Sequence, residues 1–161
     1  MVGKENSDLA RSYFDKGYKL QMEGLVKEAI ENYRMSIDLY PTAEAYTYLG
    51  WAYSMIKEYD KAIQQCYNAI ELDPEFGNPY NDIGSYLIKL KQYDEAIPWL
   101  EKAIKAPNYV PRHYPYINLG HIQEKKGDWF GAIRYYYKAL GVNKESTTAR
   151  NAIIKLTALL N

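Results

Sequence analysis

Apolar residues recur along this chain with the spacing of amphipathic helices. Two stripes of such residues lie between residues 43 and 76: Tyr46, Leu49, Gly50 and Tyr53, and then Tyr59, Ala62, Ile63, Cys66, Ala69 and Ile70. Positions three and four apart share one face of an α-helix, so each stripe is typical of a short helix with one buried face. The segment is therefore predicted to be two helices joined by a short turn.

The same pattern occurs four times. The second stripe contains an alanine at Ala29, Ala62, Ala96 and Ala132, spaced 33, 34 and 36 residues apart. Twelve residues before these alanines stand Gly17, Gly50, Gly84 and Gly120, and four residues before each glycine stand Tyr13, Tyr46, Tyr80 and Tyr116. Such a period indicates helix pairs that stack to bury a shared core. We divide the chain into a lead-in at 1–9, repeats at 10–42, 43–76, 77–112 and 113–146, and a tail at 147–161.

Small residues and turn residues fit this division. A glycine in the first helix and an alanine in the second let two helix axes approach closely, while the recurring tyrosines pack beside them. Gly24 and Gly127 supply turns between paired helices. Asn78 followed by Pro79 predicts an N-cap and a first helical position. Two extra residues around 108–115 predict that the join between the third and fourth repeats differs from the others.

The repeated unit resembles the tetratricopeptide repeat, whose pattern is an aromatic residue, Leu-Gly, Tyr, Ala, an aromatic residue, Ala and Pro. The second repeat matches best, through Tyr46, Leu49, Gly50, Tyr53, Ala62, Ala69 and Pro74, with Cys66 at the usual aromatic position. The resemblance covers nearly the whole chain. It implies an all-α fold, a right-handed superhelical α-solenoid of four repeats, with residues 147–161 as a C-terminal capping helix.

Composition limits the classes of function. The 161 residues include 20 Lys plus Arg and 20 Asp plus Glu, so no net field favours nucleic acid or an anionic membrane. The first residues are polar and charged, and no apolar stretch approaches the ~20 residues that span a bilayer. A single cysteine cannot form an intramolecular disulfide. We expect a cytoplasmic protein without membrane insertion.

Candidate chemistry is sparse. His113 and His121 are eight residues apart with no adjacent cysteine, which does not match a metal-ligand spacing. Cys66 falls at an inward position of a helix and is interpreted as a small buried hydrophobe. The glycines are spread one to a helix, so no loop is typical of phosphate binding. We expect no enzymatic activity, no metal and no cofactor.

The resemblance places function on the concave face, where the first helices of the repeats bind protein segments. With the family's geometry as guide, the inward-facing residues are expected to be Arg11, Phe14, Asp15, Tyr18 and Gln21; Glu44, Thr47, Tyr48 and Trp51; Asn78, Asn81, Asp82, Ser85 and Lys89; and Tyr114, Ile117, Asn118, His121 and Lys125. From these, the predicted peptide-binding residues are Phe14, Tyr18, Tyr48, Trp51, Asn81, Asp82, Asn118, His121 and Lys125.

The two halves of this surface differ. The N-terminal half is aromatic, and its rings either contact a ligand or pack on one another and on the lead-in. The C-terminal half is rich in amides and mixed charge. Asn81, Asn118 and Asn151 recur in successive helices, and in this family asparagines on the groove often hydrogen-bond the backbone of an extended peptide. An amphipathic or aromatic-anchored peptide fits such a surface.

One known function of the family can be tested by comparing the residues at its binding positions. Tetratricopeptide co-chaperones bind the C-terminal carboxylates of chaperones through Lys, Asn, Asn, Lys and Arg. The matching positions here hold Phe14, Tyr18, Tyr48, Asn78 and Asp82 or, one repeat later, Thr47, Trp51, Asp82, Tyr114 and Asn118. Neither set fits, so no carboxylate clamp is predicted.

The leading hypothesis is a noncatalytic adaptor or scaffold that binds a protein or peptide partner. The alternative is a self-assembling structural protein, because the tail carries apolar residues on more than one face, namely Ala152, Ile153, Ile154, Leu156, Leu159 and Leu160. RNA binding by helical repeats is disfavoured, since there is no basic stripe.

Overall fold

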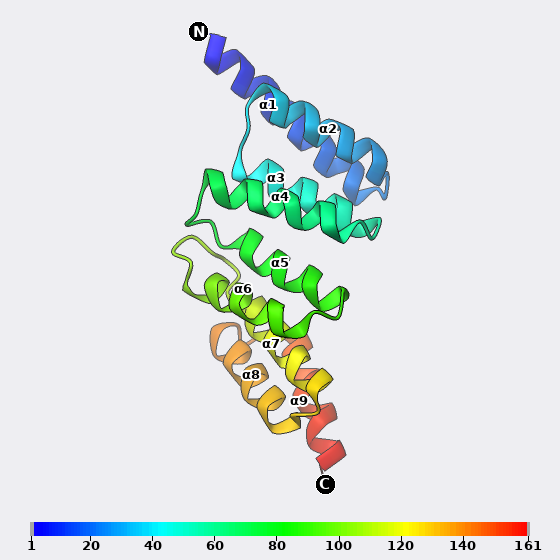
Figure 1. Cartoon of the computed structure of the whole chain (residues 1–161), viewed down its shortest axis with the longest axis vertical. Coiled ribbons are helices and arrows are strands. Elements are labelled where there is room, and N and C mark those ends of the chain that lie inside the picture. The colour runs from blue at the N-terminus through cyan, green and yellow to red at the C-terminus, as the bar shows by residue number, and fades with distance from the viewer. Residues whose placement is uncertain (1, 161) are drawn as a thin grey trace.

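The computed structural model describes residues 2–160, and over these residues the chain forms nine α-helices stacked along one long axis (Figure 1). Their bounds are α1 Val2–Met22, α2 Val26–Leu39, α3 Ala43–Met55, α4 Tyr59–Leu72, α5 Asn78–Lys89, α6 Tyr93–Lys105, α7 His113–Lys126, α8 Trp129–Val142 and α9 Thr147–Leu160. The two ends of the chain lie at opposite ends of the stack. The predicted all-α solenoid of helix pairs is confirmed.

Each odd-numbered helix from α1 to α7 packs most extensively against the even-numbered helix that follows it. The second helix of each pair then contacts the first helix of the next pair, and α8 contacts α9. The first helices also contact one another, α1 with α3, α3 with α5, and α5 with α7. They therefore form a continuous row on one face of the solenoid.

The close approach within pairs follows from the recurring glycines. A Cβ atom added to Gly84 would lie 2.5 Å from Leu100 Cδ2, and one added to Gly120 would lie 2.6 Å from Tyr136 Cε1. Real Cβ atoms do not approach other carbons so closely, because van der Waals repulsion rises steeply there. The glycine in the first helix thus makes room for a large side chain of the second.

The four turns within pairs share one backbone conformation. In each turn, the residue five positions before the recurring alanine of the second helix has a positive φ. These residues are Gly24 at 81°, Lys57 at 64°, Lys91 at 63° and Gly127 at 78°. Only the two glycines signal this conformation in the sequence. In the two lysines it costs energy, since their Cβ atoms crowd the backbone in the left-handed region.

Helix ends differ from the sequence expectations in two places. The residues from 2 to 9, expected as a lead-in, belong to α1, which runs unbroken through 21 residues. The N-cap of α5 is Gly77, so Asn78 and Pro79 occupy the first two helical positions. Both shifts extend a helix toward its N-terminus. Residue 1 of the lead-in and residue 161 of the tail lie outside the described residues.

The join between α6 and α7 has its own structure, as its extra length predicts. Asn108 forms an isolated parallel bridge with Phe76. The Gly77 amide donates to the Asn108 carbonyl at 2.8 Å, and the Asn108 amide donates to the Glu75 carbonyl at 3.1 Å. Arg112 donates to the Ile104 and Pro107 carbonyls. These hydrogen bonds connect the α6–α7 loop to the α4–α5 loop. Val110 of the α6–α7 loop therefore lies beside the row of first helices.

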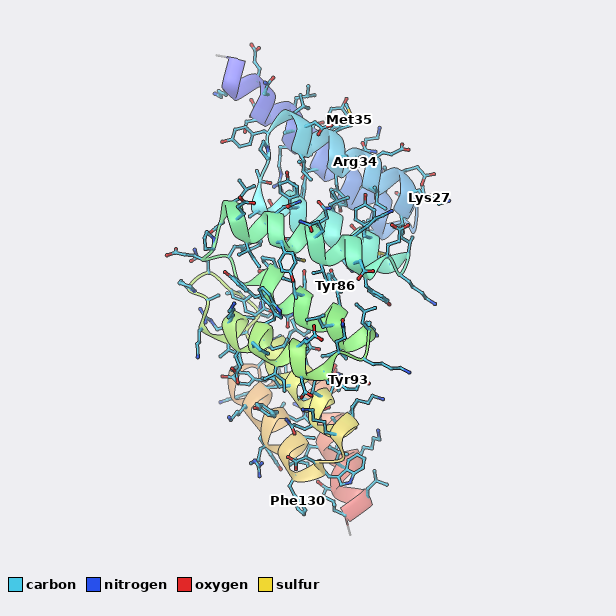
Figure 2. The ribbon with its side chains drawn as sticks, in the orientation of Figure 1. Lys27, Arg34, Met35, Tyr86, Tyr93 and Phe130 are labelled. Atoms are coloured by element: carbon cyan, nitrogen blue, oxygen red, sulfur yellow. The ribbon has the colours of Figure 1, made fainter. Side chains whose placement is uncertain are left out.

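The core runs through the stack between successive pairs. Cys66 of α4, Tyr86 of α5 and Leu100 of α6 belong to one buried cluster, of which Figure 2 labels Tyr86. Burial raises the pKa of the Cys66 thiol, which keeps it protonated and unreactive. In the next cluster, Ile153 and Leu156 of α9 pack with α8, so α9 covers the end of the last repeat. The predicted capping helix is confirmed.

Candidate binding groove

A cavity of about 410 Å³ opens on the row of first helices. Side chains of α3, α5 and α7 line it: Thr47, Tyr48, Trp51, Asn78, Asn81, Asp82, Ser85, Tyr114 and Asn118. The helical period points these residues in one direction, because each helix contributes positions three or four apart. All nine were predicted to face inward.

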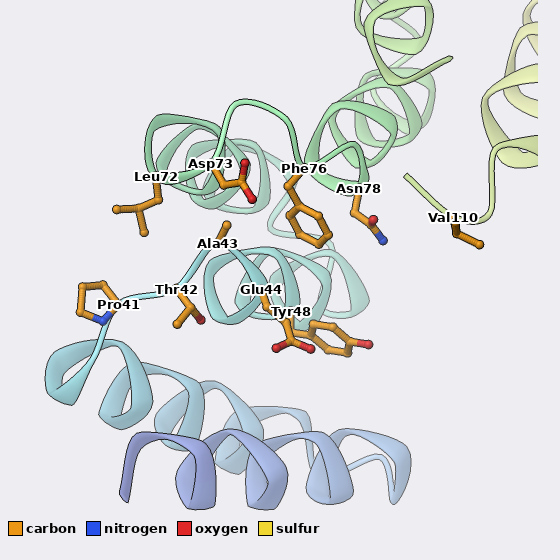
Figure 3. A pocket seen from close by; sticks show the side chains of 10 residues that line it. All are labelled: Pro41, Thr42, Ala43, Glu44, Tyr48, Leu72, Asp73, Phe76, Asn78 and Val110. Atoms are coloured by element: carbon orange, nitrogen blue, oxygen red, sulfur yellow. The ribbon is translucent and has the colours of Figure 1, made fainter. Parts of the chain in front are cut away.

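A second hollow of about 660 Å³ adjoins the first and shares Tyr48 and Asn78 with it. Figure 3 shows its lining residues around the N-terminal end of α3, where Glu44 and Tyr48 project from that helix and Phe76 and Asn78 lie near the start of α5. Leu72 is the last residue of α4, and Asp73 and Val110 come from the loops between pairs. Together the two hollows form one groove, which we call the central groove.

Aromatic rings make the N-terminal wall of the central groove. Tyr48 contacts Tyr18 and Trp51 edge-on, each with ring centroids 5.8 Å apart. Trp51 lines the inner cavity and remains 38% exposed, whereas Tyr18, which is 43% exposed, lines neither hollow and extends the aromatic surface beyond the groove. Phe14 differs, since it is 6% exposed and packs against Tyr33 and Tyr48. It supports the wall from inside the core.

Amide groups line the floor. The Asn118 side-chain amide donates to Asn81 Oδ1 at 3.0 Å, which links α7 to α5. This bond orients both side chains and leaves the Asn118 carbonyl oxygen as an acceptor. Asn151, the third member of the predicted row, is exposed on α9.

Asp82 is the charged residue of the inner cavity. Burial raises the pKa of its carboxyl to about 7, and a hydrogen bond with the Asn81 side chain acts in the opposite direction. Burial removes the water that would solvate a carboxylate, so the neutral form is favoured. Near neutral pH this carboxyl is poised between its two states.

His121 and Lys125 lie apart from the central groove. They line a separate hollow of about 600 Å³ between α5, α7 and α9, together with Ile88, Lys89, Glu124, Trp129, Ala152, Lys155 and Leu159. Burial lowers the pKa of His121, and the nearby Glu124 carboxylate partly offsets this effect. At neutral pH the imidazole is neutral, and the lysines make this end of the row basic.

Besides Phe14, two residues expected to face inward are instead part of the core. Gln21 is 1% exposed and accepts a hydrogen bond from the Tyr33 hydroxyl at 2.7 Å. Ile117 is 4% exposed and packs with α8 and α9. Both sit at the border between the groove face and the face that packs on the partner helix, which periodicity alone does not separate.

Sequence reasoning missed the groove residues that come from loops. Phe76, Asp73 and Val110, together with Pro41 and Thr42, line the outer hollow from loops, and Leu72 lines it from the last position of α4. Val110 is 87% exposed, and the extra length of its join was the one available signal.

The candidate metal ligands do not come together in the described part of the chain. Within residues 2–160, no three histidine, cysteine, aspartate or glutamate side chains converge as metal ligands. His113 is 8% exposed, with its ring 3.4 Å from the Asn143 amide nitrogen. The described helices also include none that is long and apolar enough to cross a membrane.

Comparison with known proteins identifies the repeats. Models of the tetratricopeptide repeat match residues 43–76, 78–108 and 116–149. Anaphase-promoting complex subunit 6 of Arabidopsis thaliana is 27% identical over 148 residues, which are 89% of this chain and 27% of that protein. DnaJ homolog subfamily C member 7 of Homo sapiens is 26% identical over 151 residues, 91% of this chain and 30% of that protein. The chain thus spans less than a third of the length of these relatives.

Solved structures share the arrangement of helices. The structure of MamA is 29% identical with a TM-score of 0.72, covering 84% of this chain and 79% of that one. PilF of Pseudomonas aeruginosa is 21% identical with a TM-score of 0.87, covering 96% of this chain and 70% of that one. At that identity PilF supports the fold alone.

Proposed function

Because the chain belongs to the tetratricopeptide repeat family, we propose that it is a noncatalytic adaptor or scaffold that binds a peptide or helix of a partner protein in the central groove. The observation that carries this proposal is the pair of adjoining hollows, of about 410 and 660 Å³, on the row of first helices. Anaphase-promoting complex subunit 6, one of the relatives, is by its name part of a protein complex, in keeping with such a role.

The aromatic wall supplies the anchors. Tryptophan and tyrosine contribute much of the energy of protein interfaces, because they bury a large area at little cost in side-chain entropy. Trp51 and Tyr18 are exposed but held in place by Tyr48, so little freedom is lost when a ligand covers them. A partner segment with apolar side chains would pack against these rings while its backbone reaches the amides of α5 and α7.

The groove is unsuited to a terminal carboxylate. Glu44, Asp73 and Asp82 line its two hollows, and no lysine or arginine is among the residues that do. Like charges at such range repel, and a carboxylate ligand would lose its hydration without a cationic partner. We therefore propose that the protein does not act as a carboxylate-clamp co-chaperone.

The test is selection of a phage-displayed peptide library on the immobilised full chain, followed by Kd measurements on the selected peptides. Trp51→Ala should weaken their binding by about tenfold or more, the loss expected of an interface anchor. Tyr137→Ala is the matched control, since Tyr137 is an aromatic residue on α8, 59% exposed and outside both hollows.

Circular dichroism checks that both variants keep the helix content of the wild type. If no peptide is enriched, or if the selected peptides bind Trp51→Ala as tightly as they bind Tyr137→Ala, the groove is not the binding site and the proposal fails.

A second candidate function is self-assembly, favoured by the apolar surface of the C-terminal end. Ile154 and Leu159 of α9 are 61% and 68% exposed, and Phe130 at the start of α8 is 66% exposed and points outward (Figure 2). A second copy that covers these side chains would bury apolar area. Light scattering over a concentration series tests this candidate: a dimer that Leu159→Glu dissociates supports it, and a constant mass of 18.7 kDa contradicts it.

A further inference from the structure

The inner cavity of the central groove has one negatively charged side chain and no positively charged one. Of its nine lining residues, Asp82 alone is acidic and none is lysine, arginine or histidine. Among residues 2–160, the ion pairs within 4 Å form elsewhere, and none of them includes Asp82. A partly buried carboxyl therefore faces the cavity without a counter-ion.

The basic residues along the row of first helices are paired with other carboxylates or line a different hollow. Arg11 bonds Asp15 at 3.0 Å and Glu44 at 2.9 Å, at the N-terminal edge of the row. Lys89 and Lys125 line the separate hollow near α9. Neither Arg11 nor these two lysines forms an ion pair with Asp82. A cationic group of a ligand would therefore not compete with a cation of the protein for this carboxylate.

The walls of the cavity are suited to a cation as well. Tyr48, Trp51 and Tyr114 contribute three aromatic rings from α3 and α7, and Trp51 and Tyr114 remain 38% and 49% exposed. The face of an aromatic ring carries negative potential and attracts ammonium and guanidinium groups. The methylene stem of a long basic side chain would pack on the same rings.

Polar groups complete the lining. Ser85 lies one turn from Asp82 on α5, and Asn118 has a free carbonyl oxygen because its amide nitrogen bonds Asn81. These oxygens are acceptors for the several N–H donors of a lysine or arginine head group. The cavity thus offers a carboxylate, neutral acceptors and aromatic faces, which is the set of groups that a basic side chain requires.

We propose that the inner cavity binds a lysine or arginine side chain of the partner segment, with the Asp82 carboxylate as its counter-ion and Tyr48, Trp51 and Tyr114 as its walls. The inference rests on the proposed function, because it names the chemistry of the segment that occupies the groove. The groove would then prefer a positively charged group of the ligand, whereas a carboxylate clamp prefers a negatively charged one.

Protonation of Asp82 should govern this binding. Burial raises the pKa of its carboxyl to about 7, whereas the lysine head group stays charged well above that pH. Tyr114 of α7 lines the same cavity, and the titratable groups whose pKa the Asp82 charge affects are Tyr48 of α3, Cys66 of α4, Tyr86 of α5 and Tyr109 of the α6–α7 loop. Burial raises the pKa of each of the latter groups, so they remain neutral near pH 7.

A cation binds the ionised form of Asp82, so affinity should rise with pH. With a carboxyl pKa of about 7, the ionised fraction grows about tenfold between pH 6 and pH 8, and the apparent affinity grows with it. The direction is opposite for a ligand that accepts a proton from Asp82. The pH profile therefore separates a cationic ligand from a carboxylate or amide ligand.

The experiment uses the peptide library on the immobilised wild type, on Asp82→Asn and on Glu101→Gln. Glu101 is exposed on α6, which is the second helix of its pair, so its variant removes one negative charge outside the groove. We expect lysine or arginine at one fixed position of the peptides selected by the wild type and by Glu101→Gln. Asp82→Asn should lose that enrichment.

A selected peptide is then measured against its lysine-to-norleucine version. The substitution should weaken binding to the wild type by about tenfold or more at pH 8, as expected for a charge-assisted hydrogen bond, and to Asp82→Asn by less than about twofold. Binding of the lysine peptide to the wild type should also strengthen from pH 6 to pH 8.

The outcomes separate the two proposals. Peptides that depend on Trp51 but have no preferred basic position refute the cationic pocket and leave the groove function intact. A basic position that Asp82→Asn selects equally well also refutes the pocket. A wild type that enriches no peptide refutes the groove function itself.

Discussion

Replacing Asp82 by asparagine should stabilise the protein at pH 8 and leave its stability nearly unchanged at pH 4. In the folded protein, burial raises the pKa of this carboxyl from 3.8 to about 7. Between these values the unfolded chain has lost the proton while the folded chain still holds it. The free energy of unfolding therefore falls as the pH rises from about 4 to about 7 and levels off above that.

The size of the effect follows from the shift in pKa. A difference of about three pKa values corresponds to about 4 kcal/mol, at 1.36 kcal/mol each. The side chain is only partly buried, so water and ions at the mouth of the cavity screen it. We therefore expect Asp82→Asn to gain about 1–3 kcal/mol over the wild type at pH 8. The amide has the shape of the protonated acid, so packing is retained.

The assay is urea unfolding followed by circular dichroism at intervals from pH 4 to pH 8. Every carboxylate and histidine contributes to the raw curves, so the informative quantity is the difference between Asp82→Asn and the wild type. Glu101→Gln, which also removes one carboxylate, should show a small difference that varies little with pH. A difference for Asp82→Asn that is flat, or that is largest at pH 4, would refute the placement of a desolvated carboxyl in the groove.

Three further predictions concern the repeat framework and are measured by urea unfolding. Gly84→Ala should lower the free energy of unfolding by about 1–3 kcal/mol, since the new methyl overlaps a side chain of α6. An unchanged urea midpoint would contradict the close approach of α5 and α6. Lys57→Gly and Lys91→Gly should each raise the free energy of unfolding by up to about 1 kcal/mol, because glycine adopts a positive φ without strain. A lower free energy of unfolding for both variants would contradict backbone strain at these lysines. Tyr33→Phe should cost about 1–2 kcal/mol because the buried Gln21 oxygen loses its donor, whereas a neutral effect would show that water replaces it.

Local pattern was enough to predict the helix pairs. Helical periodicity acts over three or four residues, and the repeat presents it four times, so the elements and their pairing follow from the chain. The inward-facing residues projected from the family's geometry included all nine residues that line the inner cavity. Periodicity did not predict the positive φ of Lys57 and Lys91, because lysine has no preference for that conformation.

The candidate site was predicted less completely than the fold. Phe14 and Tyr18 are four residues apart on α1, yet one is buried beneath Tyr48 and the other is 43% exposed. The loop residues Phe76 and Val110 reach the groove only because the two joins are bonded to each other. His121 and Lys125 continue the row of first helices but open on a different hollow.

The sequence by itself determined the helix pairs, their fourfold repetition and the general direction in which each side chain points, since these depend on spacing along the chain. The tertiary structure alone decided the chemistry of the groove. The bond between Asn81 and Asn118 joins residues 37 positions apart, and Asp82 loses its water only when α3, α5 and α7 come together. Burial and electrostatic environment are sums over neighbours that are distant in the chain, so they exist only once the repeats have stacked.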